Sequence, residues 1–124
     1  MLMTMYEQVG GDPFFYALVE AFYCVVEEDE TLRPMYPEEL TDAKRHLALF
    51  LVQYWGGPQT YMQERGHPRL RMRHVPFVIN KRAREAWMEA MTIALEATRG
   101  YLSPAQYDEI YAYFDMASRQ MRNV

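Results

Sequence analysis

Glycine and proline residues interrupt this sequence at short intervals, and the stretches between them carry apolar residues at helical spacing. The interruptions fall at Gly10-Gly11, Pro34 to Pro37, Gly56-Gly57-Pro58, Gly66 to Pro68, Pro76, Gly100 and Pro104. Because glycine and proline disfavour the interior of a helix, the helices are expected between these points. No stretch shows the alternation of apolar and polar residues that predicts a strand. The sequence therefore predicts an all-α fold.

The first half of the chain predicts three helices. A short one is expected over residues 3–9, and a second is expected to run to the acidic residues 27–30. Asp12 is expected to be the N-cap of the second helix, with Pro13 as its first residue. The third helix is expected over about residues 40–54, where one face is apolar. That face consists of Leu40, Ala43, Leu47, Phe50, Leu51 and Tyr54.

The second half predicts a loop followed by three further helices. Residues 59–68 are expected to be irregular, and residues 69–74 are expected to form about one helical turn before Pro76. A long helix is expected over residues 77–98. Ser103 and Pro104 are expected to be the N-cap and the first residue of the last helix. The apolar positions of that helix are Tyr107, Ile110, Tyr111, Phe114, Ala117 and Met121.

The length and charge of the chain limit what it can do. Its 124 residues predict one domain, residues 1–124, and its net charge of −4 gives no support to a nucleic-acid partner. No stretch approaches the roughly 20 apolar residues that span a bilayer, and the apolar start is too short for a signal peptide. The single cysteine, Cys24, excludes an internal disulfide and fits a reducing compartment. We therefore expect a cytoplasmic protein without a membrane partner.

Three histidines are the candidates for metal binding. His74 ends the expected one-turn helix, where an imidazole facing inward would suit a metal ligand. From spacing alone, a helix-terminal cap, whose positive form interacts with the helix dipole, is the favoured interpretation of His74, because most lone histidines are not ligands. His67 lies in a turn and is expected in solvent, and His46 is expected on a polar helix face beside Lys44. No cluster of residues has the spacing of a zinc site.

Other chemical groups give weaker signals. Cys24 lies among apolar residues and is expected to be a packed, inert thiol, so nucleophilic catalysis has little support. Tyr23, Tyr36 and Trp87 come from three different segments, and each carries a polar atom that should not be buried without a partner. A polar cage around a ligand and an ordinary aromatic core both remain open at this point.

The sequence resembles the group II truncated haemoglobins, and several stretches carry the likeness. These are YEQVGG at residues 6–11, Phe22-Tyr23, LRPMYP at 32–37, QYWGGP at 53–58, RGHPRLRMRHVPF at 65–77, and Trp87. They follow the family's order from residue 6 to about residue 98, and the last helix fits by its apolar pattern. The resemblance implies a two-over-two helical sandwich around haem.

The resemblance also implies roles for particular residues. His74 is implied as the proximal iron ligand, while Tyr23, Tyr36 and Trp87 match the family's distal polar cage. Ala43 and Leu47, one helical turn apart, match the two positions that face the bound gas. Other residues are expected at the edge of the pocket by position. His46, Tyr61, Arg71 and Arg73 are candidates for the haem propionates, and Leu70, Met72, Phe77 and Val78 for apolar walls.

The implied activity is reversible binding of O₂, CO or similar diatomic ligands. The haem is expected to be haem b, held without covalent bonds because no Cys-x-x-Cys-His stretch is present. Hydroxyl and indole donors would make oxygen binding tight and its release slow, which suits redox chemistry or sensing better than oxygen transport.

Two alternatives to gas binding stay open. The first is a haem redox enzyme, either peroxidase-like or detoxifying nitric oxide, with a reductase as partner. The second is an all-α interaction module without a cofactor. Whether the chain forms a homodimer is also left open by its sequence.

Overall fold

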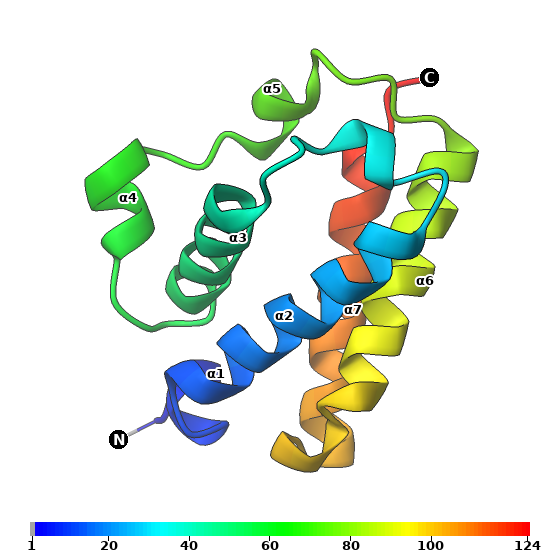
Figure 1. Cartoon of the computed structure of the whole chain (residues 1–124). Helices are drawn as coiled ribbons and strands as arrows, with labels where there is room; N and C mark the ends of the chain where they lie inside the picture. Colours follow the sequence, from blue (N-terminus) through cyan, green and yellow to red (C-terminus); the bar gives the residue numbers. More distant parts are fainter. Residues whose placement is uncertain (1) are drawn as a thin grey trace.

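The computed structural model describes residues 2–124, and over that range the chain folds into helices joined by loops (Figure 1). The described residues contain no strand, which confirms the all-α prediction. The α-helices are α1 (Met5–Gln8), α2 (Asp12–Glu28), α3 (Thr41–Tyr54), α4 (Thr60–Arg65), α5 (Leu70–His74), α6 (Lys81–Ala97) and α7 (Pro104–Met121). Two 3₁₀ turns, η1 (Arg33–Met35) and η2 (Arg99–Tyr101), complete the chain.

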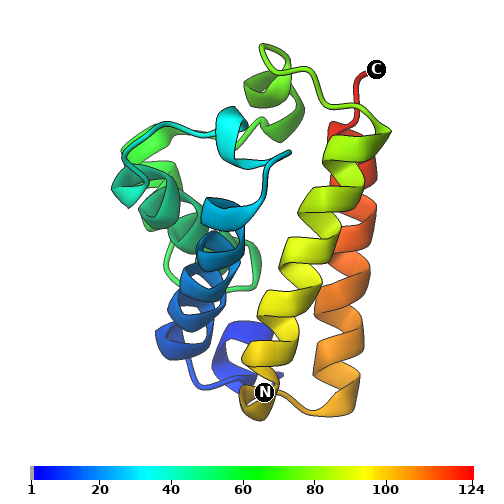
Figure 2. The ribbon, with the colours of Figure 1, turned by 45° about the vertical axis from the view of Figure 1, so that its right-hand side comes forward.

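The four long helices form two pairs, α2 with α3 and α6 with α7, which is the two-over-two arrangement that the resemblance implies. Helix α2 packs against both α3 and α6, and α6 packs against α7. Figure 2 shows α6 and α7 side by side and running in opposite directions. The short helices α4 and α5 lie beyond this framework, on the segment that links α3 to α6 (Figure 1).

Aromatic side chains dominate the contact between the helix pairs. The largest fully buried side chains include Phe14, Phe15 and Phe22 of α2 and Phe114 of α7. Each such burial contributes about 1.5–3 kcal/mol to folding. The Trp87 ring on α6 contacts Phe22 and Phe114, with ring centroids 5.4 and 5.7 Å away. The core therefore continues directly to the residues around Trp87.

Side-chain caps fix where several helices begin. The Ser103 hydroxyl accepts a hydrogen bond from the Gln106 backbone N–H, and the Gln106 side chain accepts one from the Ser103 N–H. This capping box confirms Ser103 as the N-cap of α7. Asn80 caps α6 in the same way, since its side chain accepts from the Ala83 N–H at 2.9 Å.

The predicted cap of α2 is wrong. Gly11 is the N-cap, with φ of 85°, and Asp12 is the first helical residue. The Asp12 carboxylate instead accepts a hydrogen bond from the Tyr6 hydroxyl at 2.8 Å. The Asp12 carboxylate is therefore hydrogen-bonded to a residue of α1 and does not cap α2.

The prediction of an irregular segment over residues 59–68 is wrong, because Thr60–Arg65 forms α4. A helix this short is unstable in isolation. Tertiary contacts hold it: the Tyr61 side chain is only 3% exposed and meets the Phe50 ring edge-on, 5.7 Å between centroids. The Gln53 side chain also accepts a hydrogen bond from the Met62 N–H at 2.9 Å.

Three further expectations need correction. Helix α6 begins at Lys81 and not at residue 77, because Asn80 supplies the cap and residues 77–80 form a loop. Cys24 is exposed and not packed, since it lies on the face of α2 opposite Leu18, Phe22 and Val26. On α7 the buried tyrosine is Tyr113, whereas Tyr111 is 37% exposed. None of the helices in residues 2–124 is long and apolar enough to cross a membrane.

Candidate functional site

A cavity of about 500 Å³ lies between α3, α5, α6 and α7 and is roofed by the segment around η1. This volume is typical of sites that bind small molecules or cofactors. The lining is mostly apolar and includes most of the site residues predicted from the sequence. They are Tyr23, Tyr36, Ala43, His46, Leu47, Tyr61, Leu70, Arg73, His74, Phe77 and Trp87.

Three of the predicted pocket residues lie outside this cavity. Val78 is 69% exposed and Met72 is 66% exposed, and neither lines it. Arg71 is exposed and does not line it either. All three project from α5 or from the loop that follows it. In a helix of one turn, only the side chains on the inner face, Leu70, Arg73 and His74, reach the cavity.

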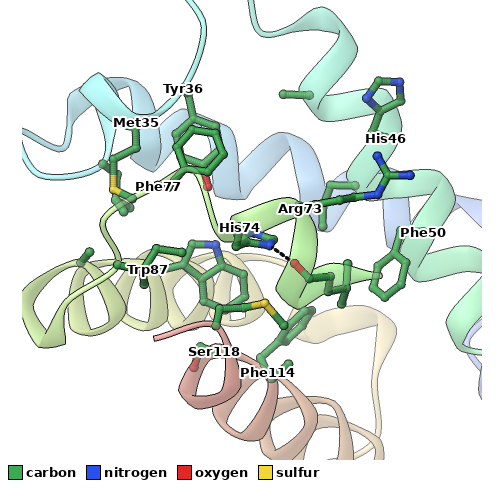
Figure 3. A pocket seen from close by; sticks show the side chains of 18 of the residues that line it. Met35, Tyr36, His46, Phe50, Arg73, His74, Phe77, Trp87, Phe114 and Ser118 are labelled. Atoms are coloured by element: carbon green, nitrogen blue, oxygen red, sulfur yellow. Dashed lines mark hydrogen bonds between the residues drawn. The ribbon is translucent and has the colours of Figure 1, made fainter. Parts of the chain in front are cut away.

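His74 presents one ring nitrogen to its own helix and leaves the other free. Its Nδ1 lies 2.5 Å from the carbonyl oxygen of Leu70, one turn earlier (Figure 3). A carbonyl oxygen only accepts hydrogen bonds, so in the neutral imidazole Nδ1 carries the proton and Nε2 keeps its lone pair. The ring lines the cavity and is half-buried. This is the arrangement that a neutral histidine needs to ligate a metal.

Arg73 anchors the short helix that carries His74. Its Nε donates to the Pro68 carbonyl at 2.7 Å, and its Nη2 donates to the Arg65 carbonyl at 3.1 Å. The guanidinium also lies 6.0 Å from the centroid of the Tyr61 ring. Arg73 therefore closes the loop between α4 and α5, in addition to the pocket-edge position predicted for it.

Tyr23, Tyr36 and Trp87 form a group of polar aromatics on the other side of the cavity. The Tyr23 and Tyr36 rings meet edge-on with centroids 5.5 Å apart. Burial raises the pKa of Tyr23 well above its ordinary value. Burial also raises the pKa of Tyr36 to about 12, although a hydrogen bond with the Trp87 side chain opposes the rise. Both hydroxyls therefore stay protonated at neutral pH and remain available as donors.

The Tyr36 hydroxyl and the Trp87 indole nitrogen point toward each other across the pocket (Figure 3). The position of Tyr36 is set by Arg33, whose guanidinium donates to the carbonyls of Pro37 and Glu38 at 3.0 and 2.8 Å. These bonds hold the loop after η1 in place, although it has no regular structure. Sequence reasoning missed Arg33, because nothing local indicates that its side chain bonds to carbonyls three to five residues further along the chain.

His46 lies at the edge of the cavity on α3. Burial, followed by the positive charge of Arg65, lowers the pKa of His46 below its ordinary value. The neighbouring Arg45 is paired instead with Glu64 of α4, with Nη2 and Oε2 2.5 Å apart. At neutral pH His46 therefore provides a neutral imidazole at this edge, not a positive charge.

The inner face of α7 supplies pocket residues that sequence reasoning did not place in the site. They are Phe114, Ala117, Ser118 and Met121, together with Arg84 of α6. The four α7 positions have the spacing of one helix face, which was the available signal. The Arg84 guanidinium donates to the Ser118 hydroxyl at 3.0 Å and to the carboxylate of Asp115. These contacts tie α6 to α7 beside the cavity.

The donors around the cavity fit an iron held by a macrocycle better than a bare metal ion. Within residues 2–124 there is no group of three or more His, Cys, Asp or Glu side chains that could hold an ion. His74 offers one nitrogen, and the walls around it are largely apolar. A metal at Nε2 would need its remaining ligands from a large, flat, apolar group, and haem has this chemistry.

Comparison with known proteins agrees with this donor set. The bacterial-like globin family matches residues 4–123. The group 2 truncated haemoglobin YjbI of Bacillus subtilis is 41% identical over 91 residues, which cover 73% of this chain and 68% of that protein. The crystal structure of a haemoglobin from Chloroflexus aurantiacus is 45% identical, with a TM-score of 0.95, covering 99% of this chain and 100% of that one. A truncated oxygen-avid haemoglobin from Bacillus subtilis is 34% identical, with a TM-score of 0.91, over 98% and 99% of the two chains.

Proposed function

The chain belongs to the bacterial-like globins, and among them to the group II truncated haemoglobins, and from this premise we propose that it binds haem b through His74 and takes up O₂ and similar diatomic ligands reversibly. The observation that carries the proposal is the His74 ring, which has Nδ1 bonded to Leu70 and Nε2 free toward an apolar cavity of about 500 Å³. The sequence has no Cys-x-x-Cys-His stretch, so the haem is held without covalent bonds.

When bound, haem supplies a ferrous iron that coordinates diatomic ligands, and the protein determines what surrounds them. His74 holds its proton on Nδ1 and offers Nε2. Leu70 and Phe77 line the cavity beside it, and such apolar walls exclude water. In a dry pocket, hydrogen bonds to a polar ligand become stronger than they are in water.

Tyr23, Tyr36 and Trp87 are proposed to hold the ligand on the distal side. Their hydroxyl and indole groups are donors at neutral pH, since burial keeps both tyrosines protonated. A hydrogen bond to a partly charged acceptor contributes about 1.5–3 kcal/mol, which corresponds to roughly a tenfold to hundredfold slower release. We therefore propose tight oxygen binding with slow release. The truncated haemoglobin from Bacillus subtilis, which is described as oxygen-avid, supports the tight binding.

Ala43 and Leu47 are proposed to control access to the distal space. They lie one turn apart on α3, and both line the cavity. A methyl group at residue 43 leaves room beside Leu47 where a larger side chain would close the path. This arrangement supports entry of a diatomic ligand without movement of the long helices.

An absorption spectrum tests the proposal. The purified protein is measured in the ferric state, after reduction by dithionite, and with CO, alongside His74→Gly with and without added imidazole. We expect a Soret band that shifts on reduction and with CO, and a proximal signature that His74→Gly loses and imidazole restores. The matched control is His67→Gly, because His67 is exposed and does not line the cavity. A wild-type chain that stays colourless after haem is added would refute haem binding and leave a cofactor-free helical module.

A further inference from the structure

Asn123, which follows α7, forms hydrogen bonds through its backbone N–H and its side-chain amide to the segment from His74 to Ile79. Its backbone N–H donates to the Ile79 carbonyl, and its Oδ1 accepts from the Ile79 N–H, both at 2.9 Å. Its Nδ2 donates to the Phe77 carbonyl at 2.9 Å and to the His74 carbonyl at 3.4 Å. One side chain thus joins α7 to the end of α5 and to the loop that follows.

This loop has few other restraints. Val75 and Val78 are 70% and 69% exposed, and only Ile79 is buried. Within the loop, the Phe77 N–H donates back to the His74 carbonyl at 3.0 Å. Exposed backbone with few apolar contacts opens at low free-energy cost. The four Asn123 hydrogen bonds are therefore a large share of what fixes the path between His74 and α6.

Helix α5 cannot fix His74 by itself, because five residues are too few to form a stable helix. The Arg73 side chain ties α5 to the segment that precedes it, because it bonds to the Pro68 and Arg65 carbonyls. Its last residue is His74, whose carbonyl and following loop are anchored by Asn123. The His74 ring is thus oriented by restraints on both sides of α5. Arg73 supplies the one before the helix, and Asn123 supplies the one after it.

We propose that Asn123 is a positioning residue for the iron ligand: it holds the backbone at His74 so that Nε2 keeps a fixed direction and distance to the haem iron. This inference rests on the proposed haem binding. The role requires asparagine chemistry, since one planar amide supplies an acceptor for Ile79 and two donors for Phe77 and His74. Aspartate keeps the acceptor, loses both donors and places a negative charge against carbonyl oxygens.

The test compares Asn123→Ala and Asn123→Asp with the wild type in the haem-loaded ferrous protein. The iron–histidine stretching band in the resonance Raman spectrum reports the geometry at His74. The rate of haem transfer to excess apomyoglobin reports how well the proximal side is held, and amide hydrogen exchange at Ile79 reports the tether itself. We expect a shifted or broadened band in both variants. In Asn123→Ala we expect about tenfold faster haem loss and about tenfold faster exchange at Ile79.

Gln106→Ala is the matched control for a loss of stability alone. Gln106 belongs to the capping box at the other end of the same helix, and it does not line the cavity. We expect Gln106→Ala to lower the melting temperature and to leave the Raman band and the haem transfer rate unchanged. If Gln106→Ala altered the band as Asn123→Ala does, the positioning role would be overturned.

Two failures are distinguishable. A wild-type chain without a Soret band would overturn the proposed haem binding, and the role of Asn123 with it. A normal wild-type spectrum, combined with an unchanged band and haem transfer rate in Asn123→Ala, would overturn the role of Asn123 alone.

Discussion

The Nδ1 atom of His74 and the carbonyl oxygen of Leu70 lie 2.5 Å apart, within one turn of the same five-residue helix. The backbone of α5 thus orients its own functional side chain, without a carboxylate partner. A backbone carbonyl is a weaker hydrogen-bond acceptor than a carboxylate, so this contact orients the ring without forming an ion pair. The same contact prevents the ring from turning by 180°, because Nδ1 would lose its acceptor.

The first prediction concerns the tautomer of His74. Because the Leu70 carbonyl can only accept, we expect the Nδ1-protonated form in the haem-free protein. Long-range ¹⁵N–¹H correlation spectra of uniformly labelled protein distinguish the two tautomers, and His74→Gln identifies the signal. A ring protonated on Nε2 would mean that this nitrogen is not available for a metal.

The second prediction concerns the Trp87 indole. We expect Trp87→Phe to keep the fold and to release oxygen about tenfold faster, because one donor to the ligand is lost while the ring is retained. Stopped-flow measurement of oxygen dissociation from the ferrous protein tests this. Trp55→Phe is the matched control, since Trp55 does not line the cavity and its indole N–H makes no hydrogen bond. An unchanged dissociation rate in Trp87→Phe would contradict tight binding by the distal group.

The third prediction compares two glycines that differ in the space around them. A Cβ atom at Gly57 would lie 2.7 Å from side-chain atoms of both Tyr6 and Val52, whereas a Cβ at Gly100 would meet nothing within 4 Å. Neither has a positive φ. We expect Gly57→Ala to lower the free energy of unfolding by about 1–3 kcal/mol through overpacking. Gly100→Ala should leave it unchanged or raise it by up to about 1 kcal/mol. Urea unfolding curves of the two variants measure the difference.

The fourth prediction is a pH dependence that arises from His46. Burial lowers its pKa in the folded state, with a further contribution from the charge of Arg65. The unfolded chain then binds more protons than the folded chain just below the ordinary histidine pKa of about 6.5. The free energy of unfolding should therefore fall as the pH drops through that value. His46→Gln should reduce this loss, and His67→Gln, at an exposed position, should not. Equal slopes in the wild type and in His46→Gln between roughly pH 5 and 7 would contradict the assignment.

Local sequence signals predicted the long helices and the short helices α1 and α5, but they missed α4. The Ser103 cap and the breaks at Gly10 and Gly56 depend on neighbouring residues, and the structure agrees with them. The predicted apolar face of α3 is confirmed only in part, because Tyr54 is 48% exposed while Leu49 and Val52 are buried. Helix α4 was missed because its stability comes from Tyr61 packing on Phe50, a contact between separate elements. The predicted Asp12 cap is wrong for the same reason, since the Asp12 carboxylate accepts a hydrogen bond from Tyr6 of another helix.

The sequence by itself determined the helical class, the family resemblance and the residue types that the pocket needs, because periodicity, breakers and motifs are properties of short stretches. Only the tertiary structure decided which of those residues meet. It brought His74, Tyr36 and Trp87 around one cavity and left Val78 in solvent. It also joined Asn123 to the loop after His74, a relationship between residues more than 40 positions apart. Such contacts depend on how the packed helices place distant side chains, and no local pattern in the sequence records that placement.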